Sequence, residues 1–338
     1  MRAARRTAPA LLIGAVALLA AACGGGSSAA GSGGGETSQL SLVAYSTPQA
    51  AYTQLIKAFQ ATPAGKGVTF KQSYGGSGDQ SRAVASGLSA DVVAFALEPD
   101  ITRLVKAGLV DASWNTGPTK GMVTDSVVVI GTRKGNPKNI RTWDDLVKPG
   151  VEVLTPNPFT SGGARWNVMA AYGAQSAHGK DDAKGMAYLN TLFHNVPVQD
   201  DSARKSLQTF TQGKGDAFVS YENEAIFAQK NGQPIDYTIP ESTLLIENPI
   251  AVTKQSKNPE KAKAFVDFLL TPAAQEIFAD NGYRPVVEGT NGREFPEPAD
   301  LFTIKELGGW DAVTLKFFDP QKGALVGVER ELGVSVKK

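Results

Sequence analysis

The stretch VTFKQSYGGSGD, residues 68–79, leads from an apolar strand pattern directly into a glycine-rich loop. The residues that follow, 79–88, repeat apolar side chains at helical spacing, so this part of the chain predicts a strand, a loop and a helix. The same order occurs on both sides, over Leu40–Tyr45 and Gln49–Ala61, and over Asp91–Phe95 and Pro99–Ala107. Repeated alternation of this kind predicts an α/β fold whose open sheets are flanked by helices and connected by right-handed crossovers.

A second series of strands and helices follows after residue 122. It comprises expected strands at Ser126–Thr132, Val151–Thr155 and Asp216–Ser220, and expected helices from about Gly163, over Asp181–His194 and over Ala203–Gln212. The strands Ser126–Thr132 and Leu244–Thr253 follow stretches rich in residues that break regular structure, so we interpret them as two links between lobes. The final predicted helices are Pro259–Leu270 and Pro272–Asp280, each with proline at its start. One lobe would then comprise residues 39–122 and 241–338, and the other residues 123–240.

The N-terminal residues have the layout of an export signal. Three arginines precede an apolar run over residues 8–22, and the sole cysteine, Cys23, follows directly. Residues 1–23 resemble a bacterial lipoprotein signal in which Cys23 becomes lipidated, although Ala20 stands where such signals usually carry leucine. Plain secretion and a retained membrane anchor are the alternatives. Residues 24–38, rich in glycine, serine and alanine, have the composition of a flexible tether.

Composition limits the partners and cofactors of the protein. The 338 residues carry 34 Lys plus Arg against 33 Asp plus Glu, a formal charge of +1, so no bulk field attracts nucleic acid or an anionic membrane. Any bound anion must therefore be held by local geometry. One cysteine and two histidines leave few ligands for a zinc or redox site, and we expect neither a metal nor another cofactor.

Small residues gather at the starts of three expected helices. They lie in the segments Tyr74–Asp79, Thr160–Arg165 and Asp201–Arg204. The first turn of a helix has amide donors without helical partners, and these can hold a phosphate-like or sulfate-like oxyanion. Glycine also lets the backbone approach a ligand closely. Each segment alone is equally typical of an ordinary helix cap, so the residues by themselves leave both interpretations open.

Several motifs in fixed order resemble one family, the bacterial sulfate/thiosulfate-binding proteins of ABC importers. They are Gly75–Gly78, Lys134–Lys138, Trp143–Leu146, Pro149–Val151, Thr155–Pro158, Ser161–Asn167, Glu222–Ala225, Tyr283–Pro285 and Leu301–Ile304. The resemblance implies a two-lobed periplasmic-binding-protein type II fold with the ligand cleft between the lobes. It also implies a non-enzymatic, extracytoplasmic monomer, tied to the cell membrane only by its lipid, that delivers the anion to the permease subunits of an importer.

The resemblance further implies a ligand shell made mostly of main-chain N–H groups. Those donors would belong to Ser46, Ser77, Gly162, Gly163 and Ala203, with the hydroxyl of Ser161 in addition. Two positions depart from the family pattern. Ser46 replaces an aspartate that would contribute only its N–H, and Tyr221 stands where the family usually has a tryptophan that donates through its indole.

Other functions remain as alternatives. The same fold could bind molybdate, tungstate or phosphate, because oxyanion choice depends on small differences in cleft geometry. A different class is an exported serine hydrolase with Ser77 or Ser161 as nucleophile, but a serine needs an adjacent base, and we expect His178 and His194 to be exposed to solvent. Arg165 and Arg204 follow two of the helix starts, where we favour a structural role over contact with the anion.

Overall fold

The computed structural model describes residues 38–336 of the chain. The predicted signal, the predicted lipidation of Cys23 and nearly all of the predicted tether lie outside the described residues. Within residues 38–336, no helix is long and apolar enough to cross a membrane.

The first half of the described chain forms alternating strands and helices, as the sequence predicts. In order, these are β1 (Ser38–Tyr45), α1 (Gln49–Gln60), β2 (Val68–Gly75), α2 (Ser77–Ala85), β3 (Val92–Ala94) and α3 (Glu98–Lys106). Strand β1 pairs in parallel with both β2 and β3, and so occupies the middle of this part of the sheet. Because parallel strands end at the same edge, the loops after β1 and β2 lie close together.

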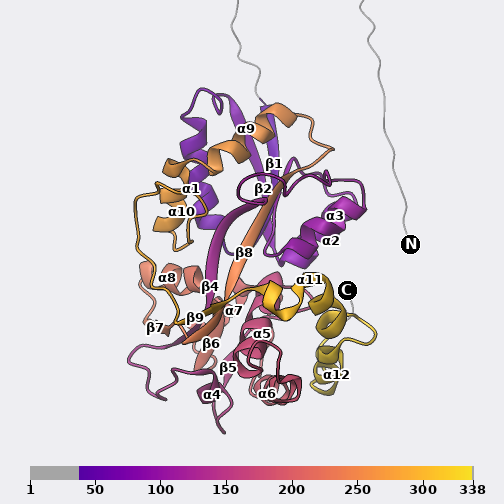
Figure 1. The fold of residues 1–338 in the computed structure, drawn as a ribbon. Helices are drawn as coiled ribbons and strands as arrows, with labels where there is room; N and C mark the ends of the chain where they lie inside the picture. The colour runs from indigo at the N-terminus through magenta and orange to yellow at the C-terminus, as the bar shows by residue number, and fades with distance from the viewer. Residues whose placement is uncertain (1–37, 337–338) are drawn as a thin grey trace, which may run out of the picture. The chain divides into compact units, whose positions relative to one another are not determined.

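Two long antiparallel strands, β4 (Met122–Arg133) and β8 (Ser242–Val252), run between the two halves of the sheet (Figure 1). One end of β8 pairs with β3, whereas β4 pairs with β6 (Ala217–Tyr221) and β7 (Ile235–Thr238). The sheet therefore has the strand order β2-β1-β3-β8-β4-β6-β5. The two strands that we interpreted as links, β4 and β8, pair with each other in the middle of this order.

The second half of the sheet is covered by helices on both faces. Its elements are α4 (Trp143–Leu146), β5 (Val153–Leu154), α5 (Gly162–Gln175), α6 (Asp182–His194), α7 (Ala203–Thr211) and α8 (Glu222–Lys230). Helix α5 lies deep in this half, because all of its residues from Trp166 to Gly173 are buried. The sequence predicted β5, α5, α6 and α7, but it predicted none of α4, α8 and β7.

The C-terminal part contains helices that the sequence analysis did not predict. Helices α9 (Pro259–Leu269) and α10 (Pro272–Asp280) match the expectation, but they are not the last. After them come β9 (Asp300–Phe302), the 3₁₀ turn η1 (Ile304–Leu307), α11 (Gly309–Val313), the π-helical turn η2 (Thr314–Phe318) and α12 (Ala324–Glu331). These pieces are too short to show a clear period in the sequence, and burial against the rest of the protein determines them.

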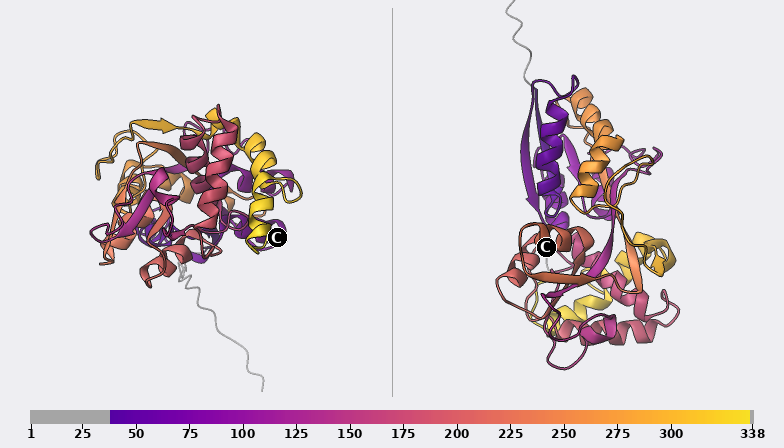
Figure 2. Two further views of the ribbon diagram at one scale, coloured as in Figure 1. Left: turned by 90° about the horizontal axis from the view of Figure 1, so that it is seen from below. Right: turned by 90° about the vertical axis from the view of Figure 1, so that its left-hand side faces the viewer.

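Separate hydrophobic clusters support the two halves. One surrounds β1 and α1, where Phe59 packs edge-on against Phe265 of α9 with ring centroids 5.2 Å apart. Another surrounds α5, where Trp166 meets Trp310 of α11 edge-on with centroids 4.6 Å apart. Figure 2 shows α12 beside the helices of this second cluster. Residues 302–325 therefore pack with α5 and α6 rather than with α1.

A like-charge pair lies on the two long strands. Asp125 of β4 is directly opposite Glu247 of β8, and the carboxyl oxygen Oδ1 of Asp125 is buried without a hydrogen-bond partner. Burial raises the pKa of Asp125 to about 7, the negative charge of Glu247 adds to the shift, and Arg284 opposes it. The shared strands thus hold a carboxyl group that gains or loses its proton near neutral pH.

Candidate anion-binding site

A small enclosed pocket lies where the starts of three helices meet the end of β1. Its lining consists of Tyr45, Ser46, Thr47, Gly75, Gly76, Ser77, Ala96, Ser161, Gly163, Ala203 and Tyr221. Six of the seven predicted ligand-binding residues are in this set, and the seventh, Gly162, is next to two of them in the chain. No residue of the lining carries a formal charge, so the pocket offers neutral hydrogen-bonding groups.

At the start of α2, the hydroxyl hydrogen of Ser77 is already used in a hydrogen bond within the protein. Its hydroxyl donates to Asp100 Oδ2 at 2.6 Å and accepts the N–H of Ala96 at 2.9 Å. Ser77 is also the first residue of α2, where the main-chain N–H has no partner within the helix. The main-chain N–H is therefore the donor that Ser77 has left for the pocket.

At the start of α5, Ser161 has the reverse arrangement. Its main-chain N–H donates to the carbonyl of Asn157 at 2.9 Å, and its Oγ accepts the N–H of Ala164 at 3.3 Å as a helix cap. The hydroxyl hydrogen of Ser161 is not used by either bond. Together with the first-turn amides of Gly162 and Gly163, it gives this helix start three available donors.

Gly162 and Gly163 hold the start of α5 close to its neighbours. A Cβ atom on Gly163 would lie 3.4 Å from Tyr221 Cε1 and 3.5 Å from Ala203 Cβ, which are ordinary contacts. A Cβ atom on Gly162 would lie only 2.7 Å from both Ala96 Cβ and Leu97 Cδ2. Helix α5 can therefore approach the β3–α3 connection this closely only with glycine at position 162.

Two buried tyrosine hydroxyls at the pocket have no hydrogen-bond partner among the described residues. They belong to Tyr45 and Tyr221, whose ring centroids are 6.3 Å apart. Burial raises the pKa of both phenols above 10, although the nearby carboxamide of Asn248 partly opposes the shift at Tyr221. Both hydroxyls therefore stay protonated at neutral pH. Leaving a buried hydroxyl unpaired costs about 1–3 kcal/mol, so these groups indicate a polar ligand in the pocket.

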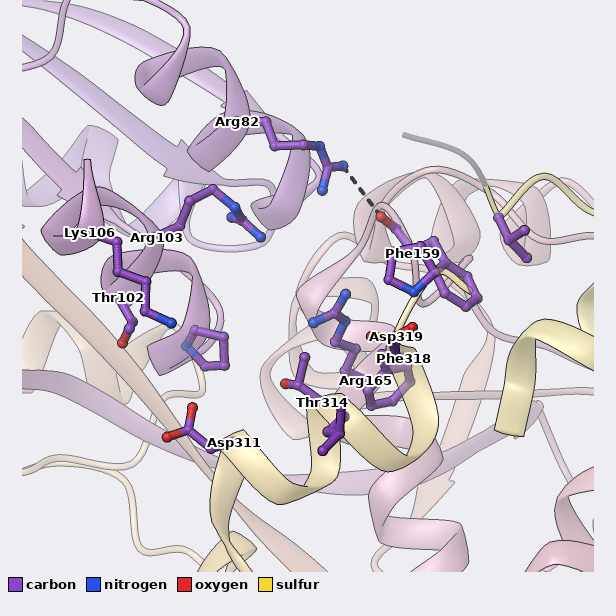
Figure 3. Close-up of a pocket in the computed structure, with 14 residues that line it drawn as sticks. Arg82, Thr102, Arg103, Lys106, Phe159, Arg165, Asp311, Thr314, Phe318 and Asp319 are labelled. Carbon is purple, nitrogen blue, oxygen red and sulfur yellow. Dashed lines mark hydrogen bonds between the residues drawn. The ribbon is translucent and has the colours of Figure 1, made fainter. Parts of the chain in front are cut away.

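The two arginines beside the helix starts do not line the pocket. Arg204 forms two bonds to Glu224, at 2.9 and 2.7 Å, which is the structural role favoured from the sequence. Arg165 donates from Nε to the carbonyl of Pro158 at 2.9 Å and extends into a separate groove of about 520 Å³, whose opposite wall includes Arg103 (Figure 3). Burial, reinforced by Arg103 and Arg82, lowers the pKa of Arg165 to about 10. Its guanidinium keeps its charge and forms no salt bridge with a carboxylate within residues 38–336.

Some features of the site were missed or wrongly predicted. Tyr45 and Gly76 line the pocket, and their positions at the end of β1 and directly after β2 could have indicated this. His178 is not fully exposed as expected, since it stacks on Phe302 and its Nε2 lies 3.0 Å from Asp300 Oδ2. Its backbone has a positive φ of 57°, and this turn directs the ring inward.

The α/β fold, with a small pocket where several helix starts meet, is typical of a solute-binding protein. Residues 40–284 match the family of bacterial extracellular solute-binding proteins, and the chain belongs to that family. The predicted resemblance to sulfate/thiosulfate-binding proteins is confirmed, and so is the predicted two-lobed α/β fold.

Three known proteins illustrate the similarity. A sulfate-binding protein of Synechococcus elongatus is 44% identical over 83% of this chain and 83% of its own length. A thiosulfate-binding protein of Escherichia coli is 37% identical over 75% of this chain and 79% of its own. The solved structure of the sulfate-binding protein SubI from Mycobacterium tuberculosis H37Rv is 46% identical, with a TM-score of 0.81, and the match covers 83% of this chain and all of that one.

Proposed function

We propose that this protein captures sulfate or thiosulfate outside the cytoplasm and delivers it to the permease subunits of an ABC importer. The observation that carries the proposal is the enclosed pocket, lined by three helix starts and an unpartnered Tyr221 hydroxyl, with no charged side chain. The sulfate- and thiosulfate-binding relatives support the same ligands. In this proposal the ligand-binding residues are the seven predicted ones, Ser46, Ser77, Ser161, Gly162, Gly163, Ala203 and Tyr221.

Proton counting explains why such a pocket would select sulfate. Sulfate is fully ionised at neutral pH and only accepts hydrogen bonds, so amide and hydroxyl donors satisfy it completely. Hydrogen phosphate keeps an O–H, and placing that group against a wall of donors leaves it unpaired, at about 1–3 kcal/mol. Discrimination by matching donors to acceptors is stronger than discrimination by size.

A calorimetric titration with sulfate, thiosulfate, molybdate, tungstate and phosphate tests the proposed function. We expect sulfate or thiosulfate to bind most tightly and to raise the melting temperature by mass action. We also expect the protein to become more compact in small-angle scattering as two lobes close. Tighter binding of phosphate or molybdate than of either sulfur oxyanion would contradict the choice of ligand, and no compaction at saturation would contradict closure.

The lobes themselves are part of the proposal. We propose residues 39–122 and 241–300 as one lobe and residues 123–240 as the other. The sequence predicts that residues 301–338 belong to the first of these lobes, but the contact of Trp166 with Trp310 supports placing them with the second. We further propose that the protein acts as a monomer and catalyses no reaction. The absence of catalysis is supported by the two candidate nucleophiles, since the hydroxyl of Ser77 is bound to Asp100 and Ser161 serves as a helix cap.

Replacing Tyr221 by phenylalanine should weaken binding if the hydroxyl contacts the anion. The loss should be about 1.5–3 kcal/mol, the value typical of a hydrogen bond to a charged group. A phenol can also accept a hydrogen bond, so tolerance of hydrogen phosphate should fall in the same variant. Affinities of the wild type, Tyr221→Phe and Tyr221→Trp for sulfate, thiosulfate and phosphate measure both effects. Equal affinities in the wild type and Tyr221→Phe would place Tyr221 outside the ligand shell.

Membrane attachment depends on Cys23 in this proposal. Its position between an apolar run and a glycine-rich tether supports lipidation, so the Cys23→Ser variant should leave the membrane fraction. Fractionation of cells that express the wild type and the variant, followed by detection of the protein in each fraction, measures this. A Cys23→Ser protein that is processed normally and still sediments with membranes would show that another anchor holds it.

A further inference from the structure

We propose that Glu224 is a positioning residue for the anion pocket, acting through Arg204 on the main-chain donors of Ala203 and Ser46. The inference rests on the proposed function, because it concerns how that pocket is held in shape. Glu224 does not line the pocket, and its carboxylate would not touch the anion.

Glu224 is a fully buried carboxylate in the first turn of α8. Both of its oxygens accept hydrogen bonds from Arg204, from Nε at 2.9 Å and from a terminal nitrogen at 2.7 Å. This two-bond geometry fixes the plane of the guanidinium as well as its position. The Arg204 side chain also lies over the ring of Phe227, with 3.7 Å from Cζ to the ring centroid.

The held arginine reaches the loop that follows β1. It donates a further hydrogen bond to the carbonyl of Thr47 at 2.8 Å, and its own main-chain N–H lies 3.5 Å from Ser46 Oγ. Arg204 directly follows Ala203, the first residue of α7. One guanidinium therefore connects α8, the start of α7 and the loop that carries Ser46.

A second set of bonds fixes the same loop from another side. Thr47 Oγ1 and the Tyr283 hydroxyl are 3.0 Å apart, and Asn223 Nδ2 donates to that hydroxyl at 3.0 Å. The residue before Glu224 thus holds Thr47 through Tyr283, while Glu224 holds it through Arg204. Support of the pocket therefore explains why two polar residues, Asn223 and Glu224, are buried side by side.

Charge favours the same assignment. Burial opposes the charge on Arg204, but the Glu224 carboxylate outweighs burial and raises the pKa of Arg204. Neutralising Glu224 would leave a buried cation that is free to turn toward other acceptors. The Thr47 carbonyl and the start of α7 would then lose their common support, and donors displaced by a fraction of an ångström bind an anion less well.

The test is the sulfate affinity of Glu224→Gln, measured by calorimetry beside the unliganded melting temperature. Glu222→Gln is the matched control. Glu222 is equally buried and lies nearer to Tyr221 in the chain, but its carboxylate pairs with Arg284, at 3.1 and 3.0 Å, rather than with Arg204. Both variants should melt at lower temperature. Only Glu224→Gln should also bind sulfate about tenfold more weakly, the factor that corresponds to about one hydrogen bond.

Two conservative variants complete the test. Glu224→Asp keeps the charge and should recover part of the affinity, whereas Arg204→Lys keeps the charge but loses the two-bond geometry and should resemble Glu224→Gln. Wild-type affinity in Glu224→Gln, or an equal loss in Glu222→Gln, would overturn the inference while the proposed function stands. If Glu224→Gln does not fold, wild-type affinity in Arg204→Lys would overturn it instead. A wild-type protein that binds no sulfate would remove the proposed function, and the inference with it.

Discussion

Replacing Gly162 by alanine should lower the affinity for sulfate by about 100-fold or more. The added Cβ would lie 2.7 Å from Ala96 Cβ and from Leu97 Cδ2, and 3.1 Å from Ser77 Cβ. These neighbours belong to the opposite proposed lobe, so relief of the overlap would separate α5 from the start of α2. The anion would then contact the donors of α5 and α7 or those of α2 and Ser46, but not both sets at once.

The measurement is a sulfate titration of Gly162→Ala, with Gly327→Ala as the control. Gly327 lies inside α12, where a Cβ would meet nothing within 4 Å, so alanine there should stabilise the helix slightly and leave the affinity unchanged. Gly76→Ala is the reciprocal variant, since its Cβ would lie 2.8 Å from the carbonyl oxygens of Thr160 and Asp201. A Gly162→Ala protein that binds sulfate within threefold of the wild type would show that the helix starts need not approach so closely.

Replacing Asp125 by asparagine should stabilise the protein by an amount that grows with pH. The pKa of Asp125 is about 7 in the folded protein and near 4 in an unfolded chain. Between these values the folded state binds a proton that the unfolded state has lost, so the free energy of unfolding falls as pH rises. Asparagine carries no charge opposite Glu247 and avoids this loss. The difference should be small at pH 4 and on the order of 3 kcal/mol at pH 8.

Urea unfolding of the wild type and Asp125→Asn at pH 4, 6 and 8 measures the effect. Comparison of the two proteins at each pH cancels the titration of the groups that they share. Glu247→Gln provides a second comparison, because removal of that charge should recover only the smaller, electrostatic part of the destabilisation. A stability difference that is the same at all three pH values would show that folding does not raise the pKa of Asp125.

The fold was predictable wherever apolar residues recur with one regular spacing along a whole helix or strand. Helix α10 was predicted with its observed bounds, and α1 differs from its prediction by one residue at its C-terminal end. Helix α8 was missed because buried polar residues occupy its first turn, so the sequence there has no apolar stripe. The turns between Ile304 and Phe318 were missed for another reason, namely that Trp310 and Phe317 determine them through tertiary contacts.

The candidate site could be predicted in its parts but not in its connections. Helix starts rich in small residues indicated main-chain donors, and the structure brings these residues to one pocket. The sequence did not indicate that Arg204 would pair with Glu224, twenty residues away. It also did not indicate that Arg165 would bond to the carbonyl of Pro158 and to no carboxylate of the described chain. Pairing of this kind depends on which helices become neighbours, and local pattern carries no information about that.

The commitment of the Ser77 hydroxyl to Asp100 and Ala96 has a consequence for directed evolution. If the anion is held by peptide groups, a library of side-chain replacements at the helix starts would leave the donors themselves unaltered. Most members would keep their preference or fail to fold, and few would acquire a new ligand. A change of ligand preference would instead require insertions or deletions that redirect the backbone. Among single side-chain replacements, those at Tyr221 should have the most influence on the choice of anion.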